Sequence, residues 1–227
     1  MTKISFIIPT FNESNYLPLL LSDLSVLNEV GEVIVVDSCS EDKTRFIATI
    51  YGAKLYKSNK KNRGLQLNIG ANKAKGEWFI FLHADCRLRQ DLNNELQSIL
   101  EGDKNLIYYF KFKINNKKIT YRFLEFLVNL RCYLLNNPYG DQGLIIHRDT
   151  YYYNNGYKKI PLMEDLDFIR RLNNKKKLKM FKFPIFTSSR KWEKTNFIFQ
   201  AFKNWRYRQR WLKGESIESI YEDYYKV

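Results

Sequence analysis

Residues 77–87, E-W-F-I-F-L-H-A-D-C-R, join an apolar run to a polar cluster. The run at 78–82 follows Gly76 and has no charged residue, as is typical of a strand covered on both faces of a parallel sheet. His83 and Asp85 come directly after it, at the kind of sheet edge where open α/β folds bind ligands. We therefore expect a central strand with a ligand site at its end. For Asp85 by itself, capping of the next helix is the alternative.

Strand and helix patterns alternate outward from this run. Before it, strands are expected at 4–8, 33–36 and 53–56, and helices at 17–27, 41–51 and 65–75. After it, helices are expected at 92–100 and 119–135, from 164 and across 196–213, and strands at 106–114 and 144–146. This order predicts an α/β fold, with a Rossmann-like, mostly parallel central sheet flanked by helices and a helical C-terminal region.

Length and composition favour one folded domain, residues 1–227, with 44% hydrophobic residues. The formal charge of +14 predicts attraction to phosphates, nucleic acid or an anionic membrane surface. The three cysteines show no C-x-x-C pairing, which is typical of reduced intracellular proteins. Since no window approaches the roughly 20 apolar residues of a membrane span, we expect a cytoplasmic protein, either free or peripheral on the cytoplasmic face of the membrane.

Two of the expected helices have faces with alternative interpretations. In 119–135, Arg122, Glu125 and Asn129 form a narrow polar face opposite a wide apolar one. Packing of this helix in the core is the favoured interpretation, and a membrane-facing surface is the alternative. The helix across 196–213 mixes aromatic and basic residues, which fits an anionic membrane surface and packing across the sheet equally well.

The turn after the first strand excludes one class of nucleotide-binding enzyme. It reads P-T-F-N-E-S, where a dinucleotide-binding dehydrogenase would have G-x-G-x-x-G. Asp37 ends the second strand, where an acidic residue can hold a ribose. Nucleotide binding without the glycine fingerprint is therefore still expected.

Six short motifs occur in an order that is specific as a set. They are P-T-F-N-E at 9–13, V-D-S-C-S-E-D-K-T at 36–44, L-H-A-D at 82–85, G-D-Q-G at 140–143, M-E-D at 163–165 and S-x-R-x-W at 188–192. Together they resemble the family-2 glycosyltransferases of the GT-A fold, and most closely a small bacterial subgroup. The resemblance covers nearly the whole chain. It implies a nucleotide-sugar-binding half at 1–90, an acceptor and catalytic half at 91–195, and C-terminal helices at 196–227.

The resemblance also implies an activity, which is transfer of a hexose, with inversion, from a nucleotide sugar such as a UDP-hexose to an acceptor hydroxyl. A lipid or membrane-associated acceptor is expected. Asp165 resembles the general base, and Glu164 beside it would tune its pKa. Without the family context, this acidic pair would be assigned to the helix dipole. The donor residues implied are Pro9, Thr10, Asn12, Glu13, Asp37, Arg63, His83, Ala84 and Asp85; for Arg63, a solvated loop position is the alternative.

Asp85 resembles the last aspartate of the family's D-x-D motif, which binds a divalent cation that neutralises the leaving diphosphate. His83 replaces the first acid. Because imidazole is a softer ligand than carboxylate, this replacement shifts the expected metal from Mg²⁺ towards Mn²⁺; alternatively, His83 hydrogen-bonds the phosphate or orients Asp85. Contacts with acceptor or phosphate are further expected for Asp141, Gln142, Arg190 and Trp192.

Two other functions compete with this interpretation. A sugar-phosphate nucleotidyltransferase would share the sheet but needs a glycine-rich basic signature after the first strand, and P-T-F-N-E is not one. A basic nucleic-acid- or anion-binding module on a degenerate GT-A fold would explain the charge. It leaves the acids at successive strand ends unexplained, so nucleic acid is not the expected partner.

Overall fold

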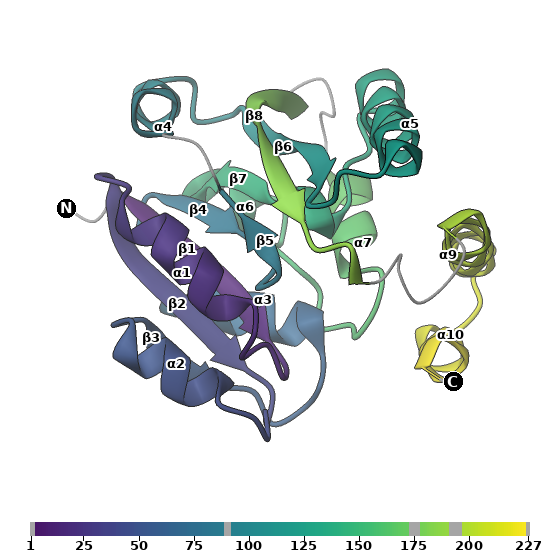
Figure 1. Cartoon of the computed structure of the whole chain (residues 1–227), viewed down its shortest axis with the longest axis horizontal. Coiled ribbons are helices and arrows are strands. Elements are labelled where there is room, and N and C mark those ends of the chain that lie inside the picture. Colours follow the sequence, from purple (N-terminus) through teal and green to yellow (C-terminus); the bar gives the residue numbers. More distant parts are fainter. Residues whose placement is uncertain (1–2, 89–91, 173–177, 191–196, 226–227) are drawn as a thin grey trace.

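The computed structural model describes residues 3–88, 92–172, 178–190 and 197–225. An eight-stranded sheet in the order β3-β2-β1-β4-β7-β6-β8-β5 crosses the molecule, with helices on both of its faces (Figure 1). This architecture confirms the predicted α/β class with a mostly parallel central sheet.

The N-terminal half of the sheet is entirely parallel, as the alternating patterns predict. It consists of β1 (Ile4–Thr10), β2 (Val30–Asp37), β3 (Lys54–Lys57) and β4 (Trp78–Phe81), connected by α1 (Leu17–Ser25), α2 (Thr44–Ile50) and α3 (Arg63–Lys73). Thr10 pairs with Asp37 at the carboxyl ends of β1 and β2. These two strands therefore end side by side, which places the loops that follow them at one edge of the sheet.

The C-terminal half of the sheet is mixed, since β7 runs antiparallel to β4 and to β6, whereas β6 and β8 are parallel. Its strands are β5 (Cys86–Arg87), β6 (Ile107–Ile114), β7 (Leu144–His147) and β8 (Leu178–Thr187). Its helices are α4 (Asn93–Leu100), α5 (Ile119–Leu135), α6 (Arg148–Tyr153), α7 (Glu164–Arg171), α9 (Phe197–Leu212) and α10 (Ile217–Tyr225), and a 3-10 turn, η1, spans Gly140–Gln142.

Three of these elements have no counterpart in the sequence-based prediction: α6, β5 and β8. The sequence pattern of β8 does not predict a strand because Pro184 interrupts it; this residue lies at the register shift between β6 and β8. A proline is accommodated at such an irregularity because the regular ladder is already interrupted there. Proline inside an apolar run therefore does not exclude a strand in this chain.

The hydrophobic core lies on both faces of the sheet. Alternate residues of each strand point to opposite faces, so Phe6 and Ile80 pack with α1, α2 and α4, whereas Ile7 and Phe79 pack with α3, α6 and α7. All four of these strand residues are almost completely buried. The central strands are therefore fixed from both sides, and their carboxyl ends provide a rigid platform.

The expected orientation of α5 is wrong. Its polar residues face inward: Asn129 Oδ1 accepts a hydrogen bond from the Phe112 N–H at 2.8 Å, and Glu125 Oε1 accepts one from the Ile114 N–H at 2.7 Å. Large apolar side chains of the same helix, such as Phe126, are exposed. The reason is that β6 has backbone groups to satisfy here, because among the described residues Tyr108 alone pairs with β7.

None of the helices in the described ranges combines the length and the apolar character needed to cross a membrane.

Candidate active site

Polar side chains gather where β1, β2 and β4 end, close to the N-terminal ends of α3 and α7 and to the turn η1. The loop after β4 carries His83, Ala84 and Asp85, and the N-terminal turn of α7 carries Glu164 and Asp165. These residues come from two separate segments of the chain. The fold brings them together because parallel strands present their carboxyl ends at the same sheet edge.

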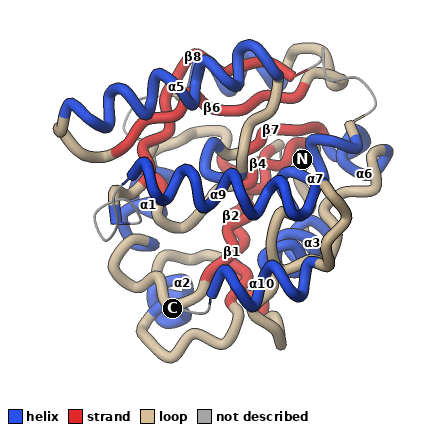
Figure 2. Tube along the Cα trace, turned by 90° about the vertical axis from the view of Figure 1, so that its right-hand side faces the viewer, coloured by secondary structure: helices blue, strands red, loops and turns tan. Residues whose placement is uncertain are grey.

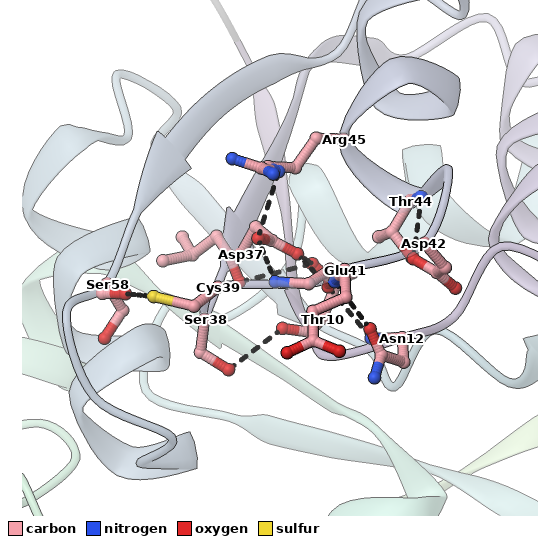
Figure 3. A network of polar contacts seen from close by, with 12 residues as sticks. Thr10, Asn12, Asp37, Ser38, Cys39, Glu41, Asp42, Thr44, Arg45 and Ser58 are labelled. Carbon is pink, nitrogen blue, oxygen red and sulfur yellow. Dashed lines mark hydrogen bonds and ion pairs between the residues drawn. The ribbon is translucent and has the colours of Figure 1, made fainter.

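Asp37 is fully buried, and its carboxylate is bonded to neighbouring residues at the same sheet edge (Figure 3). Its carboxylate accepts hydrogen bonds from Thr10 Oγ1 at 3.1 Å and from the Ser40 N–H at 3.0 Å, and the Ser40 hydroxyl also donates to it. Arg45 Nε lies 3.9 Å away. Asp37 therefore ties the end of β1 to the loop after β2.

The loops after β1 and β2 are joined by further hydrogen bonds around Asn12 (Figure 3). The Asn12 N–H donates to Ser40 Oγ at 2.9 Å, and Asn12 Oδ1 accepts from the Glu41 N–H at 2.9 Å. Asn12 has a φ of 53°, a conformation that asparagine tolerates better than most residues. Asn12 and Asp37 thus hold the loop that presents Thr10 and Glu13, and their contact with a donor stays a prediction.

A cavity of about 330 Å³, here called the donor cavity, opens at this edge. Seven of the predicted donor residues line it, together with Arg190: Pro9, Thr10, Glu13, Arg63, His83, Ala84 and Asp85. Its cations are Lys61, Arg63 and Arg190. Three cations around a cavity that also contains two carboxylates suit a ligand with more than one negative charge, such as a diphosphate.

Arg190 connects two acids of the donor cavity. Its Nη2 lies 2.6 Å from Glu13 Oε1 and 3.3 Å from Asp85 Oδ2, and its guanidinium lies over the Tyr16 ring at 4.6 Å. Burial alone would lower the pKa of Arg190, but Glu13 and Asp85 outweigh this effect and raise it. The side chain is therefore a fixed cation within the cavity wall.

Arg63 reaches from the first turn of α3 to Glu164 at the start of α7, where Nε and Oε1 form an ion pair. Glu164 is fully buried, and burial raises the pKa of its carboxyl, an effect that Arg63 opposes. Burial would lower the pKa of Arg63, but Glu164 and Asp165 raise it above its usual range. The ion pair thus locks the two helix ends together beneath the cavity, and Arg63 is not a freely solvated loop residue.

Asp165 is held by backbone donors next to His83. Its Oδ2 accepts a hydrogen bond from the Gly140 N–H at 2.6 Å, and its Oδ1 accepts one from the Leu166 N–H at 2.7 Å. A β-carbon added at Gly140 would lie 2.9 Å from His83 Nε2 and 3.1 Å from Asp165 Oδ2. Both side chains therefore converge on this glycine, and the missing side chain leaves room for them.

A second cavity, of about 320 Å³, lies on the other side of His83 and is here called the acceptor cavity. Asp141 and Asp165 line it, and Arg63 and His83 line both cavities. Its remaining wall comes from β6, α5, the turn before η1, the start of α7 with the residues just before it, α9 and α10, and includes apolar residues such as Leu124, Leu162 and Trp205. The two cavities thus share a boundary formed by Arg63 and His83.

Two other predicted residues have different outcomes. Gln142 is fully buried: its Oε1 accepts hydrogen bonds from the Tyr139 N–H at 3.3 Å and from Cys132 Sγ at 3.0 Å, and its Nε2 donates to the Phe110 carbonyl at 3.4 Å. It braces the η1 turn, and it is not among the residues that line the two cavities. Trp192 lies outside the described residues.

Several cavity residues were not singled out from the sequence. Lys61 belongs to a basic loop, and its Nζ lies 4.0 Å from the centre of the Phe11 ring and 5.2 Å from that of Tyr225. In the acceptor cavity, Arg208 donates to the Tyr139 hydroxyl at 2.8 Å. The charge of the loop at 57–63 was a usable signal for Lys61. Tyr225 had none, because nothing local indicates that α10 returns to the N-terminal half.

The surroundings of Asp85 indicate whether its carboxylate could bind a divalent cation. Asp85 is buried, and within the described part of the chain its Oδ2 accepts no hydrogen bond and has the ion-pair contact with Arg190 Nη2 at 3.3 Å. Mg²⁺ and Mn²⁺ are often held by one or two carboxylates, with the other ligands coming from substrate phosphates and water. A buried carboxylate oxygen that accepts no hydrogen bond from the described residues fits such an ion, although these residues contain no cluster of three or more potential metal ligands.

Comparisons with known proteins identify the family of this chain. Residues 5–213 match the family model described as glycosyl transferase family 2. An uncharacterised glycosyltransferase of Haemophilus influenzae is 28% identical over 180 residues, which are 74% of this chain and 61% of that protein. The chain therefore spans less than two thirds of this relative's length.

Solved structures show the same fold. Staphylococcus aureus TarS 1-349 in complex with UDP-GlcNAc matches with a TM-score of 0.64 and 19% identity, over 82% of this chain and 58% of that one. Glucosyl-3-phosphoglycerate synthase from Mycobacterium tuberculosis, in complex with Mn²⁺, UDP-glucose and phosphoglyceric acid, matches with a TM-score of 0.55 and 17% identity, over 78% and 68%.

Proposed function

The chain belongs to glycosyl transferase family 2, and we propose that it transfers a hexose, with inversion, from a UDP-sugar to an acceptor hydroxyl. The observation that carries this proposal is the meeting of the two cavities at Arg63 and His83. In an inverting displacement the acceptor approaches the sugar carbon from the side opposite the leaving diphosphate. Two cavities on either side of a shared boundary provide room for these two directions.

The donor cavity is suited to the nucleoside diphosphate. Lys61, Arg63 and Arg190 place positive charge around it, and charge-assisted hydrogen bonds from guanidinium to phosphate are among the stronger polar contacts. As the bond from the sugar to the diphosphate breaks, negative charge grows on the leaving oxygen. Preorganised cations lower the energy of that state more than that of the ground state.

Asp165 is the proposed general base. It lines the acceptor cavity, and its carboxylate orientation is fixed by the Gly140 and Leu166 N–H groups. It would accept the proton of the acceptor hydroxyl while the hydroxyl oxygen forms its bond to the sugar carbon. Glu164 positions the site through its ion pair with Arg63.

A divalent cation would be held by Asp85 Oδ2, with His83 either as a second ligand or as a hydrogen-bond donor to phosphate. When bound, such an ion neutralises charge on the diphosphate. Arg190, 3.3 Å from the same oxygen, supplies part of this neutralisation from the protein itself. The structure of glucosyl-3-phosphoglycerate synthase, which has the same fold, contains Mn²⁺ together with UDP-glucose, and this supports the use of a divalent cation here.

The test is a panel of nucleotide sugars, incubated with Mn²⁺ or Mg²⁺ and with candidate acceptors. Release of the nucleoside diphosphate is measured, and the anomeric configuration of the product is determined by NMR. Turnover of one donor, with the configuration inverted, is expected. Retained configuration would contradict the inverting mechanism, and a chain that neither binds nor consumes any donor would contradict the transferase function. The alternative function, a nucleic-acid- or anion-binding module, would then be favoured.

A further inference from the structure

The outward face of α5 is apolar along almost its whole length. Six side chains, here called the α5 stripe, have exposed fractions between 38% and 79%: Ile119, Phe123, Phe126, Leu127, Leu130 and Leu134. Their spacing places them on one side of the helix. A contiguous apolar surface of this kind on a folded chain marks an interaction site.

The exposure of the α5 stripe is fixed by hydrogen bonds on the opposite face of the helix. Besides the bonds to Asn129 Oδ1 and Glu125 Oε1 described above, Asn129 Nδ2 donates to the Phe112 carbonyl at 2.9 Å, and Arg122 donates to the Ile114 carbonyl at 3.1 Å. Rotating the helix to bury the stripe would break these bonds and leave β6 backbone groups unsatisfied. The outward orientation is therefore a stable property of the fold.

Helix α9 extends the apolar surface. Phe199, Phe202 and Trp205 are more than half exposed, and the rings of Phe202 and Trp205 stack with their centres 5.6 Å apart. Figure 2 shows α5 and α9 running across the same face of the molecule, and Figure 1 shows both at one side. The two helices thus form a shared surface.

The charges beside this surface indicate what covers it. Residues 104–140 contain seven Lys and Arg and a single acid, Glu125, which is buried. Helix α9 carries Lys203, Arg206, Arg208 and Arg210 and no acid. Aromatic and aliphatic residues accompanied by basic ones are the combination that binds the interface of an anionic bilayer. A second copy of this chain would bring the same positive charge and be repelled.

Both helices contribute to the wall of the acceptor cavity. Leu124, Val128 and Arg131 of α5 and Trp205 and Arg208 of α9 line it. A molecule embedded in a bilayer beneath the two helices would therefore meet the cavity directly, without first leaving the membrane.

We propose that α5 and α9 dock on an anionic lipid bilayer and that the acceptor is a membrane lipid whose hydroxyl enters the acceptor cavity. The second part of this inference rests on the proposed transferase function. The docking part depends only on the surface of the two helices and is tested separately.

The experiment is flotation of the full chain with vesicles of phosphatidylcholine alone or with about a third phosphatidylglycerol. A triple variant, Phe123→Gln, Phe126→Gln and Leu134→Gln, removes part of the α5 stripe without touching the core. The matched control is Phe46→Gln, Ile50→Gln and Tyr153→Gln, which changes equally exposed residues on α2 and α6. Hydrolysis of the donor without acceptor is measured on all three proteins.

We expect the wild type and the control to float with anionic vesicles at low salt, and the stripe variant to partition about tenfold less or worse. Donor hydrolysis should be equal in all three. Absence of wild-type binding at low salt, or unchanged binding of the stripe variant, would overturn the docking surface. So would a solution dimer that the stripe variant dissociates, if the wild type does not bind vesicles. Vesicle binding without turnover of any donor would leave the docking surface standing and would overturn the transferase function, whereas turnover with soluble acceptors and none with membrane lipids would overturn the lipid acceptor alone.

Discussion

The guanidinium of Arg190 contacts the carboxylate of Glu13 at 2.6 Å, although 177 positions separate the two residues. The same Nη2 atom lies 3.3 Å from Asp85 Oδ2. The loop after β1, the loop after β4 and the segment after β8 therefore meet at one cation. A diphosphate entering the donor cavity would compete with the two carboxylates for this charge.

Replacing Arg190 by alanine should weaken nucleoside diphosphate binding about 10- to 100-fold, because a charged hydrogen bond of about 1.5–3 kcal/mol is lost. Arg190→Lys should retain an intermediate affinity, since lysine keeps the charge without the planar donor fork. Calorimetric titration with UDP measures both. Arg148→Ala, which removes an exposed arginine outside both cavities, is the control. Equal affinities of Arg190→Ala and wild type would contradict a role in donor binding.

Asp165→Asn should lower the transfer rate about 10²- to 10⁴-fold, because the amide cannot accept the acceptor's proton. Donor affinity should change little, since Asp165 lines the acceptor cavity. The measurements are the steady-state rate and the UDP dissociation constant. Asp149→Asn, whose side chain is 88% exposed, is the control. If Asp165→Asn retained wild-type turnover, another group would have to be the base.

Gly140→Ala should reduce turnover at least about tenfold while the chain stays folded. The new β-carbon would lie within about 3 Å of His83 Nε2 and Asp165 Oδ2, so these side chains must move apart, and small displacements of reacting groups are costly. Gly102→Ala is the control, because its β-carbon would meet only the carbonyls at the end of α4. Circular dichroism and turnover distinguish the two variants. Undiminished activity of Gly140→Ala would show that the convergence on this glycine is not needed.

Removing divalent metal with EDTA should lower activity, and Asp85→Asn should raise the Mn²⁺ concentration needed for half-maximal rate at least about tenfold. The reason is that the Asp85 carboxylate is the proposed metal ligand, and the neutral amide of asparagine binds a divalent cation more weakly. Mn²⁺ titration in the presence of UDP gives a readout independent of turnover. Full activity in EDTA would contradict a role for the metal, and the charge of the leaving diphosphate would then be neutralised by Arg190 and its neighbouring cations alone.

Asp42 should make stability depend on acid pH. Burial would raise the pKa of Asp42, but hydrogen bonds from Thr44 and Ser14 outweigh it and lower the pKa to about 2. The folded form therefore binds this proton more weakly than the unfolded chain, whose aspartate has a pKa of about 3.9. The stabilisation is present above pH ~4 and is lost as the pH falls towards 2.

Asp42→Asn should accordingly lower the free energy of unfolding by about 1 kcal/mol at pH 7, and the difference from wild type should vanish near pH 2. Urea unfolding at pH 7, 4 and 2.5 measures this trend. Glu41→Gln changes an exposed acid next to Asp42 and should leave the pH trend unchanged. A constant difference between Asp42→Asn and wild type at all three pH values would contradict the pKa argument.

The N-terminal half was predictable because its local patterns agree with the fold. The apolar runs before Thr10, Asp37 and His83 have both faces covered, so periodicity alone identifies strands and their order predicts a parallel sheet. The same reasoning predicted a ligand site at the end of β4, where His83 and Asp85 line the donor cavity, whereas Arg63 was assigned to it only through the family resemblance. Lys61 and Tyr225 were missed because their place in the donor cavity depends on how segments far apart in the sequence pack together, which no local pattern predicts.

The helix α5 shows where pattern reading fails. Its amphipathic periodicity correctly predicted a helix at 119–135, but periodicity does not state which face points inward. That choice depends on β6, whose backbone groups beyond Tyr108 need partners that β7 does not supply in the described structure. Gln142 illustrates the same limit: the G-D-Q-G motif is a site signal, yet the Gln142 amide serves the backbone of Phe110 and Tyr139.

The side chains of α5 that bond to Phe112 and Ile114 take the place of a neighbouring strand. Unpaired strand backbone is a template for self-association, and proteins that leave it open are prone to aggregate. If α5 detached, it would uncover this backbone and free an apolar helix in the same event. Shortening or destabilising α5 should therefore produce insoluble protein during expression, so the helix protects the chain's solubility even though its outer surface is apolar.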